Sequence, residues 1–285
     1  MKIHSTVESM RAASRAAKQA GQRIGFVPTM GALHEGHLSL VRAAKAQCDA
    51  VVVSIFVNPL QFGPKEDLAK YPRPFERDRE LLEKEGVNFL FAPSAEEMYP
   101  QSAVTYVTVE GLSERLCGKS RPGHFRGVTT VVAKLFHIVE PDAAYFGQKD
   151  AAQVTIIRRM VRELNFPVEI AVCPIVREPD GLAMSSRNAY LSPEQRKSAL
   201  VIYRSLMEVK TQFDRGEKNA TRLIEAGKRI LTTDAEVRLD YLQVVDPEEL
   251  KPVEVVSGTA LVAVAAFVGA TRLIDNIVLV TDGKK

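Results

Sequence analysis

Three segments with different patterns of apolar residues follow one another in residues 23–57, RIGFVPTMGALHEGHLSLVRAAKAQCDAVVVSIFV. Residues 23–29 form a short apolar run of the kind found in β-strands. Residues 36–48 place their apolar residues at helical spacing. Residues 50–57 are a continuous β-branched run, which is typical of a strand covered on both faces. The stretch therefore predicts a strand, a helix and a second strand.

The same alternation continues to about residue 173. A strand–helix–strand rhythm of this kind predicts a mostly parallel sheet with right-handed crossovers. We therefore expect an α/β fold with a Rossmann-like parallel sheet and helices on both faces. The further expected helices are the N-terminal stretch to residue 21 and residues 76–86, 128–140 and 151–164, and the further expected strands are residues 87–93, 104–110, 142–147 and 167–173.

The pattern changes near residue 175. Residues 192–213 read as a helix with Ser192 as the N-cap, Pro193 in the first turn and Gln195 at the third helical position. A second helix is expected at about 219–232. Three strands then follow without helices between them, which indicates antiparallel pairing in a smaller α+β domain. The predicted domains are residues 1–175 and 176–285, and the predicted strands of the second are residues 237–245, 259–268 and 271–280.

The composition is that of an ordinary globular protein. The 285 residues suffice for one large domain or two modest ones, and the 46% of hydrophobic residues can form a sizeable core. A net charge of +3 is too small to imply nucleic acid, and no apolar segment reaches the roughly 20 residues of a membrane span. The N-terminus lacks the apolar core of a signal peptide. The widely spaced Cys48, Cys117 and Cys173 favour a reducing compartment, so we predict a cytoplasmic protein.

Two histidines stand where the helix of residues 36–48 begins. His34 and His37 are three residues apart, so they share a helical face, and Gly36 allows close backbone approach. The N–H groups and the dipole of a helix N-terminus attract anions. The pair alone fits capping or surface residues, a metal site, or donors to phosphate oxygens. Capping is favoured for an isolated pair, and a metal site is the weakest interpretation because suitably spaced further ligands are absent.

A second polar stretch, residues 146–153, follows a predicted strand and opens a helix. Lys149 is a mobile positive charge suited to phosphate. Asp150 is either an N-cap or an acceptor from a ribose hydroxyl. Gly147 lets the backbone approach a nucleotide. This stretch would lie at the same edge of the sheet as the two histidines.

Three more polar stretches lie after strands or at the domain boundary. Residues 181–192 contain two serines and an arginine in a loop bounded by glycine, a set suited to polyphosphate. Residues 54–73 place Asn58 and Gln61 after a buried strand, where neutral amides can position a polar substrate. Residues 121–128 add two arginines and a histidine. Together these stretches predict a phosphate-binding site at the carboxyl edge of the sheet.

The same stretches resemble a known family. HEGH matches the histidine signature H-x-G-H of the nucleotidylyltransferase and class I synthetase superfamily, and MSSRN resembles a degenerate form of its second signature. Nearly the whole chain resembles the pantothenate synthetase (pantoate–β-alanine ligase) family. The stretches that carry the resemblance are FVPTMGALHEGHLSL, SIFVNPLQFGP, YPRPFERD, RPGHFRGVTTVV, YFGQKDAAQ and GLAMSSRNAYLS.

The resemblance implies an activity and an assembly. It implies a cytoplasmic homodimer with a Rossmann-like domain for ATP and pantoate and a smaller lid domain. It implies ATP-dependent condensation of (R)-pantoate with β-alanine through a pantoyl-adenylate, releasing AMP and pyrophosphate. Mg²⁺ would bridge the phosphates of ATP. No nucleic acid or membrane takes part in this reaction.

The resemblance also implies a set of site residues. His37, which the family assigns as proton donor, acts with His34, Lys149 and Arg187 in catalysis. Gln61, Gln153 and Asn58 bind substrate, with Gln61 also near β-alanine, and Asp78 is the candidate metal contact. The residues that line ATP are Met30, Gly31, Ala32, Leu33, His34, Glu35, Gly36, His37, Gly147, Gln148, Lys149, Asp150, Val176, Met184, Ser185, Ser186 and Arg187.

Two features depart from the family pattern. Gln148 stands where the family more often has Glu, while its neighbours Lys149 and Asp150 are kept. The second signature lacks its usual lysines, so Arg187 and Lys149 would supply that charge. Two other functions remain open: a nucleotidylyltransferase that stops at a nucleotide product without releasing AMP, and a nucleotide-binding sensor without turnover. A truncated aminoacyl-tRNA synthetase is disfavoured because no basic anticodon-binding domain follows.

Overall fold

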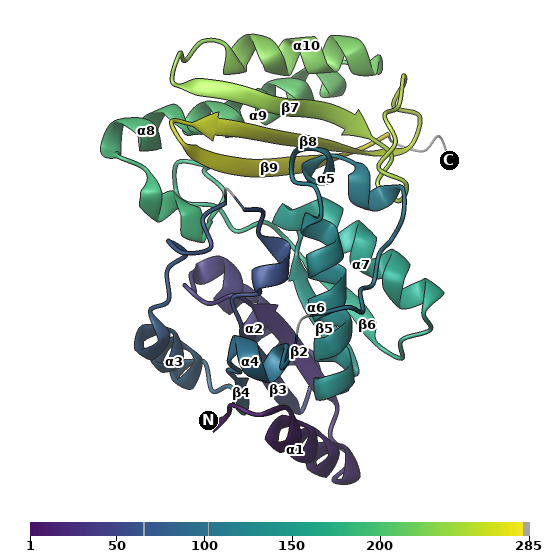
Figure 1. Cartoon of the computed structure of the whole chain (residues 1–285). Helices are drawn as coiled ribbons and strands as arrows, with labels where there is room; N and C mark the ends of the chain where they lie inside the picture. The colour runs from purple at the N-terminus through teal and green to yellow at the C-terminus, as the bar shows by residue number, and fades with distance from the viewer. Residues whose placement is uncertain (65, 102, 282–285) are drawn as a thin grey trace. The chain divides into compact units, whose positions relative to one another are not determined.

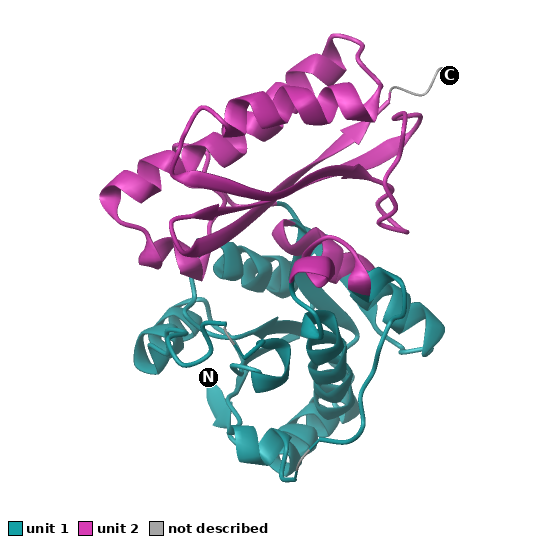
Figure 2. Cartoon of the chain, turned by 45° about the horizontal axis from the view of Figure 1, so that its top comes forward, with its two compact units in different colours: residues 1–113, 121–148, 156–174 teal, residues 114–120, 149–155, 175–285 magenta. Residues whose placement is uncertain are grey.

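The structure is a computed structural model that describes residues 1–64, 66–101 and 103–281. These residues divide into two compact units (Figure 2). The first unit comprises Met1–Ser113, Arg121–Gln148 and Ile156–Pro174, and the second comprises Glu114–Ser120, Lys149–Thr155 and Ile175–Lys285.

The first unit is built on a sheet whose strands are all parallel (Figure 1). The strand order is β1-β4-β3-β2-β5-β6, so β2 and β3 lie inside the sheet. This arrangement confirms the predicted α/β fold. The strands are β1 (Lys2–His4), β2 (Ile24–Thr29), β3 (Ala50–Ile55), β4 (Phe89–Phe91), β5 (Ala143–Gly147) and β6 (Glu169–Cys173).

Short and long helices connect these strands. The α-helices are α1 (Val7–Gln19), α2 (Glu35–Gln47), α3 (Phe75–Lys84), α4 (Ala95–Met98), α5 (Cys117–Ser120), α6 (His124–Val139) and α7 (Ala151–Glu163). The 3-10 helices are η1 (Pro59–Gln61), η2 (Leu112–Glu114) and η3 (Gln148–Asp150).

Successive residues of β2 face different helices, which shows that both faces of the sheet are covered. A Cβ atom built on Gly25 would lie 3.2 Å from Cβ of Ala44 in α2, and Val27 belongs to the same core as Ala44. The intervening Phe26 instead packs its ring against Phe136 of α6, with ring centroids 6.4 Å apart. Because side chains alternate along a strand, α2 and α6 lie on opposite faces.

The predicted strand at residues 104–110 is wrong. This segment is irregular, and its polar backbone groups bond to side chains of α6. The N–H of Val107 donates to Oγ1 of Thr130 over 3.0 Å, and the Val107 carbonyl accepts from Oγ1 of Thr129. The two threonine hydroxyls thus supply the hydrogen-bond partners that a neighbouring strand would otherwise supply to Val107. Conversely, the sequence pattern missed β1, which pairs with β4 and lies within the N-terminal stretch that was expected to be helical.

The second unit contains an antiparallel sheet of β7 (Val237–Val245), β8 (Thr259–Val268) and β9 (Thr271–Val280). Its core joins β8 to α9 (Leu200–Asp214) and α10 (Ala220–Leu231). The α+β character and the bounds of the three strands match the prediction. The expected helix at residues 192–213 is two helices, α8 (Pro193–Ser198) and α9, joined at Ala199.

The capping box that was expected at the start of α8 is present. The Ser192 hydroxyl accepts from the Gln195 N–H over 3.2 Å, and the Gln195 side chain accepts from the Ser192 N–H over 3.1 Å. These bonds satisfy two backbone donors that a helix start leaves without partners. Among the described residues, none of the helices combines the length and the apolar character needed to cross a membrane.

Backbone contact between α6 and η1 depends on Gly127. A Cβ atom at this position would lie 2.2 Å from the Leu60 carbonyl oxygen and 2.6 Å from the Gln61 nitrogen. No L side chain fits these distances without movement of the backbone. Gly127 therefore allows α6 to hold the loop that follows β3.

We predict that Gly127→Ala destabilises the protein. Overpacking costs about 1–3 kcal/mol, which exceeds the gain of about 1 kcal/mol from replacing a helical glycine by alanine. The melting temperature of the variant should fall by several degrees. Gly258→Ala is the control, because no atom lies within 4 Å of its new Cβ. Equal melting temperatures for the two variants would contradict the close contact.

Candidate active site

The loop after β2 is held by a buried carboxylate. Oδ2 of Asp78 accepts from the Ala32 N–H over 2.7 Å, and Oδ1 accepts from the Leu33 N–H over 2.8 Å. Gly31 and Ala32 both have positive φ, at 82° and 51°. Burial raises the pKa of Asp78, and the two backbone bonds oppose that rise. Asp78 therefore fixes the strained turn that leads into α2.

His34 and His37 cap the start of α2 with their ring nitrogens. Nδ1 of His34 accepts from the Gly36 N–H over 3.2 Å, and Nδ1 of His37 accepts from the His34 N–H over 3.4 Å. The two rings lie 4.1 Å apart between centroids. A backbone N–H only donates, so Nδ1 carries the lone pair and the proton of the neutral ring is on Nε2.

This geometry confirms the capping interpretation of the histidine pair, whereas the phosphate interpretation stays a prediction. The Nδ1 atoms act as caps. The proton of each neutral ring is on Nε2, and this N–H is of the type that can donate a hydrogen bond to a phosphate oxygen. Glu35, between them in sequence, makes a bidentate ion pair with Arg42 at 2.6 and 2.9 Å. In the part of the chain that the structure describes, no three His, Cys, Asp or Glu residues cluster in a way that could hold a metal.

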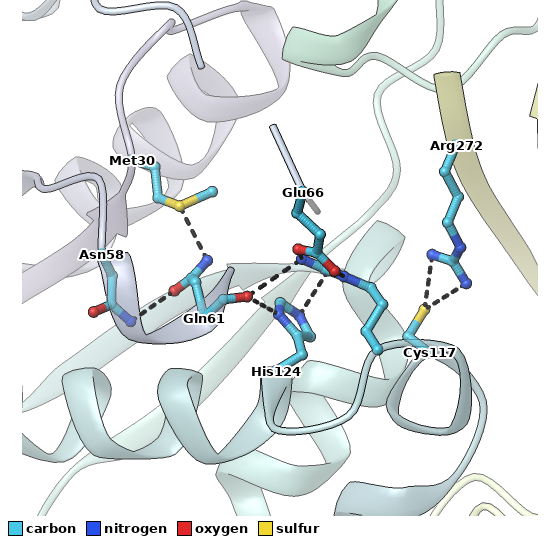
Figure 3. A network of polar contacts seen from close by, with 8 residues as sticks. Met30, Asn58, Gln61, Glu66, Cys117, His124 and Arg272 are labelled. Atoms are coloured by element: carbon cyan, nitrogen blue, oxygen red, sulfur yellow. Dashed lines mark hydrogen bonds and ion pairs between the residues drawn. The ribbon is translucent and has the colours of Figure 1, made fainter. Parts of the chain in front are cut away.

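Asn58 is buried and fixes the side chain of Gln61 (Figure 3). Its amide nitrogen donates to Oε1 of Gln61 and to the Gly127 carbonyl, both over 3.1 Å. Its oxygen accepts from the Tyr99 hydroxyl over 2.9 Å. Nε2 of Gln61 is 3.0 Å from the sulfur of Met30. Asn58 thus orients Gln61 and brings it to the loop that precedes the histidines.

The backbone of Gln61 is held from the other side. Nδ1 of His124 lies 2.9 Å from the Gln61 carbonyl oxygen, and Nε2 lies 3.0 Å from the Arg121 guanidinium (Figure 3). The carbonyl only accepts and the guanidinium only donates, so the tautomer of His124 that fits both contacts is the neutral ring with its proton on Nδ1. Arg121 also forms a bidentate ion pair with the carboxylate of Glu66, with N–O distances of 2.6 and 2.8 Å.

The ion pair with Arg121 affects the pKa of Glu66. Burial raises the pKa, but the hydrogen bonds and charge of Arg121 outweigh burial, so the pKa lies below its usual value. Arg126, from the same polar stretch as Arg121, lies instead over the ring of Tyr106 at 4.6 Å. The structure therefore brings Arg121 and His124 to Gln61 and gives Arg126 a packing role.

The remaining predicted site residues fall in both units. Gly147 and Gln148 belong to the first unit, as do residues 30–37, Asn58, Gln61 and Asp78. Lys149, Asp150 and Gln153 belong to the second unit, together with Val176 and residues 184–187. The roles of all these residues stay predictions.

Within the second unit, two backbone turns present predicted site residues. Lys149 and Asp150 form an ion pair at 3.7 Å in the turn η3 before α7. Ser185 caps the turn η4 (Ser186–Tyr190), and its hydroxyl accepts from the Arg187 N–H over 3.3 Å. Tyr99 and Glu66, which contact Asn58 and Arg121, were not predicted from the sequence, because both lie outside any periodic pattern.

Comparison with known proteins identifies the class. A model of the family "Pantoate-beta-alanine ligase" matches residues 2–278. The pantothenate synthetase of Koribacter versatilis is 59% identical over 283 residues, covering 99% of this chain and 97% of that protein. That of Acidobacterium capsulatum is 67% identical over 256 residues, covering 90% and 86%.

Solved structures agree with these relatives. The crystal structure of pantothenate synthetase from Thermus thermophilus matches with a TM-score of 0.92 and 50% identity, covering 97% of this chain and 99% of that chain. The pantoate-beta-alanine ligase of Francisella tularensis matches with a TM-score of 0.79 and 36% identity, covering 97% of both chains. That structure is a complex with beta-gamma ATP and β-alanine.

The chain is thus a ligase that joins an acid to an amine. It belongs to the pantoate-beta-alanine ligase family, and its reaction is the condensation of pantoate with β-alanine.

We predict that Asp78→Asn loosens the loop before α2. An amide keeps only one acceptor oxygen, so its NH₂ group would face a buried N–H, at a cost of about 1–3 kcal/mol. Both the melting temperature and the apparent affinity for ATP should fall. Asp142→Asn is the control, since Asp142 accepts the Ile24 N–H at the opposite end of β2. The account fails if both variants change the KM for ATP equally.

Proposed function

We propose that the condensation proceeds through an enzyme-bound pantoyl-adenylate. A carboxylate oxygen of pantoate attacks the α-phosphorus of ATP, and pyrophosphate leaves with the electron pair of the broken P–O bond. The amine of β-alanine then attacks the acyl carbon, loses its proton, and displaces AMP. The observation that carries this proposal is that Nδ1 of His34 and Nδ1 of His37 accept backbone N–H groups at the start of α2, which assigns the proton of each neutral ring to Nε2.

Negative charge grows on the phosphoryl oxygens and on pyrophosphate in the first step. Donors fixed in advance stabilise such charge without reorganising, which is often the largest catalytic contribution. In the proposal His34 and His37 donate to the phosphates at the N-terminus of α2. Lys149 and Arg187 supply positive charge from the second unit, where the family's second signature usually supplies lysines.

The neutral amides are proposed to bind the acid. Gln61 and Gln153 hold pantoate, and Gln61 also lies near β-alanine. Asn58 acts by holding Gln61, because its amide nitrogen and oxygen are already bonded within the first unit. The residues that line ATP in this proposal are residues 30–37, Gly147 to Asp150, Val176 and residues 184–187.

The beta-gamma ATP and β-alanine of the Francisella complex support the proposed substrates. Mg²⁺ would bind with the nucleotide and offset the negative charge of its phosphates, since phosphate oxygens and water are its preferred ligands. Asp78 fits poorly as a protein ligand for this ion, because it is 1% exposed and both carboxylate oxygens accept backbone N–H groups. The proposal also includes a cytoplasmic homodimer in which residues 176–285 act as a lid.

Isotope exchange tests the intermediate. With pantoate, ATP and Mg²⁺ but without β-alanine, labelled pyrophosphate should enter ATP, because adenylate formation is reversible before the amine arrives. Omitting pantoate is the control and should abolish exchange. Exchange that requires β-alanine would contradict a free-standing adenylation step.

Paired substitutions test the role of the histidines. In His34→Asn the oxygen replaces Nδ1 as a cap and the Nε2–H donor is lost. In His34→Gln the amide nitrogen replaces Nε2 and the cap is lost. If phosphate binding dominates, the Asn variant should lose about 10²-fold in adenylate formation, and the Gln variant much less. The same order is expected at His37.

Preformed pantoyl-adenylate separates the half-reactions. Pyrophosphate has left at that stage, so all four variants should convert the adenylate to pantothenate at rates near the parent rate. His137→Asn, on the last turn of α6, is the control for general effects of losing a histidine. A collapse of the adenylate-fed reaction in the His37 variants would instead assign His37 as the base for β-alanine.

A further inference from the structure

Asp275 and Asn276 are adjacent polar residues in β9, and both are only 3% exposed. The rest of the TRLIDNIVLV strand is largely apolar, so two neighbouring buried polar side chains are unexpected there. Burying them is unfavourable unless their polar atoms are bonded. Their partners therefore indicate why these residues stand in the core of the second unit.

Asp275 binds the segment that leads to residues 184–187. The guanidinium of Arg177 makes a bidentate pair with Asp275 at 2.6 and 2.9 Å. It also donates to the Gly181 carbonyl over 3.1 Å and lies 4.2 Å from the ring centre of Tyr203. Arg177 is thereby held on three sides.

Arg177 belongs to a short hairpin that precedes Ser185. It pairs with Ala183 in an antiparallel bridge, and the Met184 N–H donates to the Val176 carbonyl over 3.0 Å. Gly181 turns this hairpin with φ of 97°. Because Met184 ends the hairpin, the Asp275–Arg177 pair sets where the Ser185 turn begins.

Asn276 binds the turn that carries Lys149. Its amide nitrogen donates to the Lys149 carbonyl over 3.0 Å, and its own N–H donates to Oδ1 of Asp275 over 2.7 Å. Burial raises the pKa of Asp275, while Arg177, the Asn276 N–H and the Lys149 ammonium oppose that rise. The adjacent residues Asp275 and Asn276 thus contact the hairpin that precedes Ser185 and the turn that carries Lys149.

We propose that Asp275 and Asn276 are positioning residues that fix the spacing between Lys149 and the Ser185–Arg187 turn. This inference rests on the proposed roles of Lys149 and Arg187 at ATP. Two segments far apart in sequence would each vary in position if held separately. Because both segments are anchored to adjacent residues of one strand, they keep a constant spacing. In the proposal, the positive charges of Lys149 and Arg187 then bind the same polyphosphate.

Kinetics of Asn276→Ala test the anchor at Lys149. The variant should raise the KM for ATP about fivefold, as expected for one lost hydrogen bond, while the KM values for pantoate and β-alanine stay near the parent values. Asn219→Ala is the matched control, because Asn219 caps α10 in the same unit. It should lower the melting temperature without changing the KM for ATP. A fivefold rise in the control as well would overturn the inference.

A double-mutant cycle on kcat/KM for ATP separates positioning from general destabilisation. If Asn276 acts through Lys149, Asn276→Ala should add little in a Lys149→Ala background. Additive losses would overturn the inference while leaving the role of Lys149 intact. A Lys149→Ala variant with parental ATP kinetics would overturn the proposed role of Lys149 itself, and the inference with it.

Arg177→Lys provides the second variant, and replaces Asn276→Ala if that protein does not fold. Lysine keeps the charge beside Asp275 but cannot hold both carboxylate oxygens and the Gly181 carbonyl in one fork. It should also raise the KM for ATP severalfold with little effect on the KM for pantoate. Unchanged ATP kinetics in Arg177→Lys would overturn the anchor at the hairpin.

Discussion

The lone pairs of two imidazole rings at the start of α2 determine what the rest of the site can do. Nδ1 of His34 and Nδ1 of His37 accept backbone N–H groups, so the remaining ring nitrogens carry protons. Asp78 holds the turn that delivers these rings, through the Ala32 and Leu33 N–H groups. Backbone geometry therefore selects a protonation state that suits phosphate.

The neutral amide of Gln61 and the segments that carry Lys149 and Arg187 are held by different sets of residues. Within the first unit, Asn58 donates to the side-chain amide of Gln61 and accepts from Tyr99, while His124 contacts the Gln61 backbone carbonyl. The Lys149 turn and the hairpin before Ser185 are held by β9 in the second unit. Buried Asn58 takes part in the first support and buried Asp275 and Asn276 in the second. Supporting residues of this kind keep the geometry of a site constant.

Some of this organisation was readable in the sequence. The strands β7 to β9 were predicted at their observed bounds, because strand-forming segments are separated there by turn residues such as Gly258 and Gly269. Residues 104–110 show the same composition but bond to Thr129 and Thr130, and composition does not reveal whether a strand or a helix supplies the partners. HEGH predicted a site at the start of α2, and that role stays a prediction. The tautomers of His34 and His37 depend on the local backbone conformation, which the residue types alone do not specify. The Asp275–Asn276 anchor depends on contacts distant in sequence.

The tautomers of His34, His37 and His124 test the central claim most directly. Long-range ¹H–¹⁵N correlation spectra of protein labelled with [¹⁵N]histidine distinguish a protonated Nε2 from a protonated Nδ1, and single His→Gln variants assign each ring. Near neutral pH the account predicts Nε2–H neutral rings for His34 and His37, and the opposite Nδ1–H ring for His124 as an internal reference. Nδ1–H rings or imidazolium ions at His34 and His37 would contradict it.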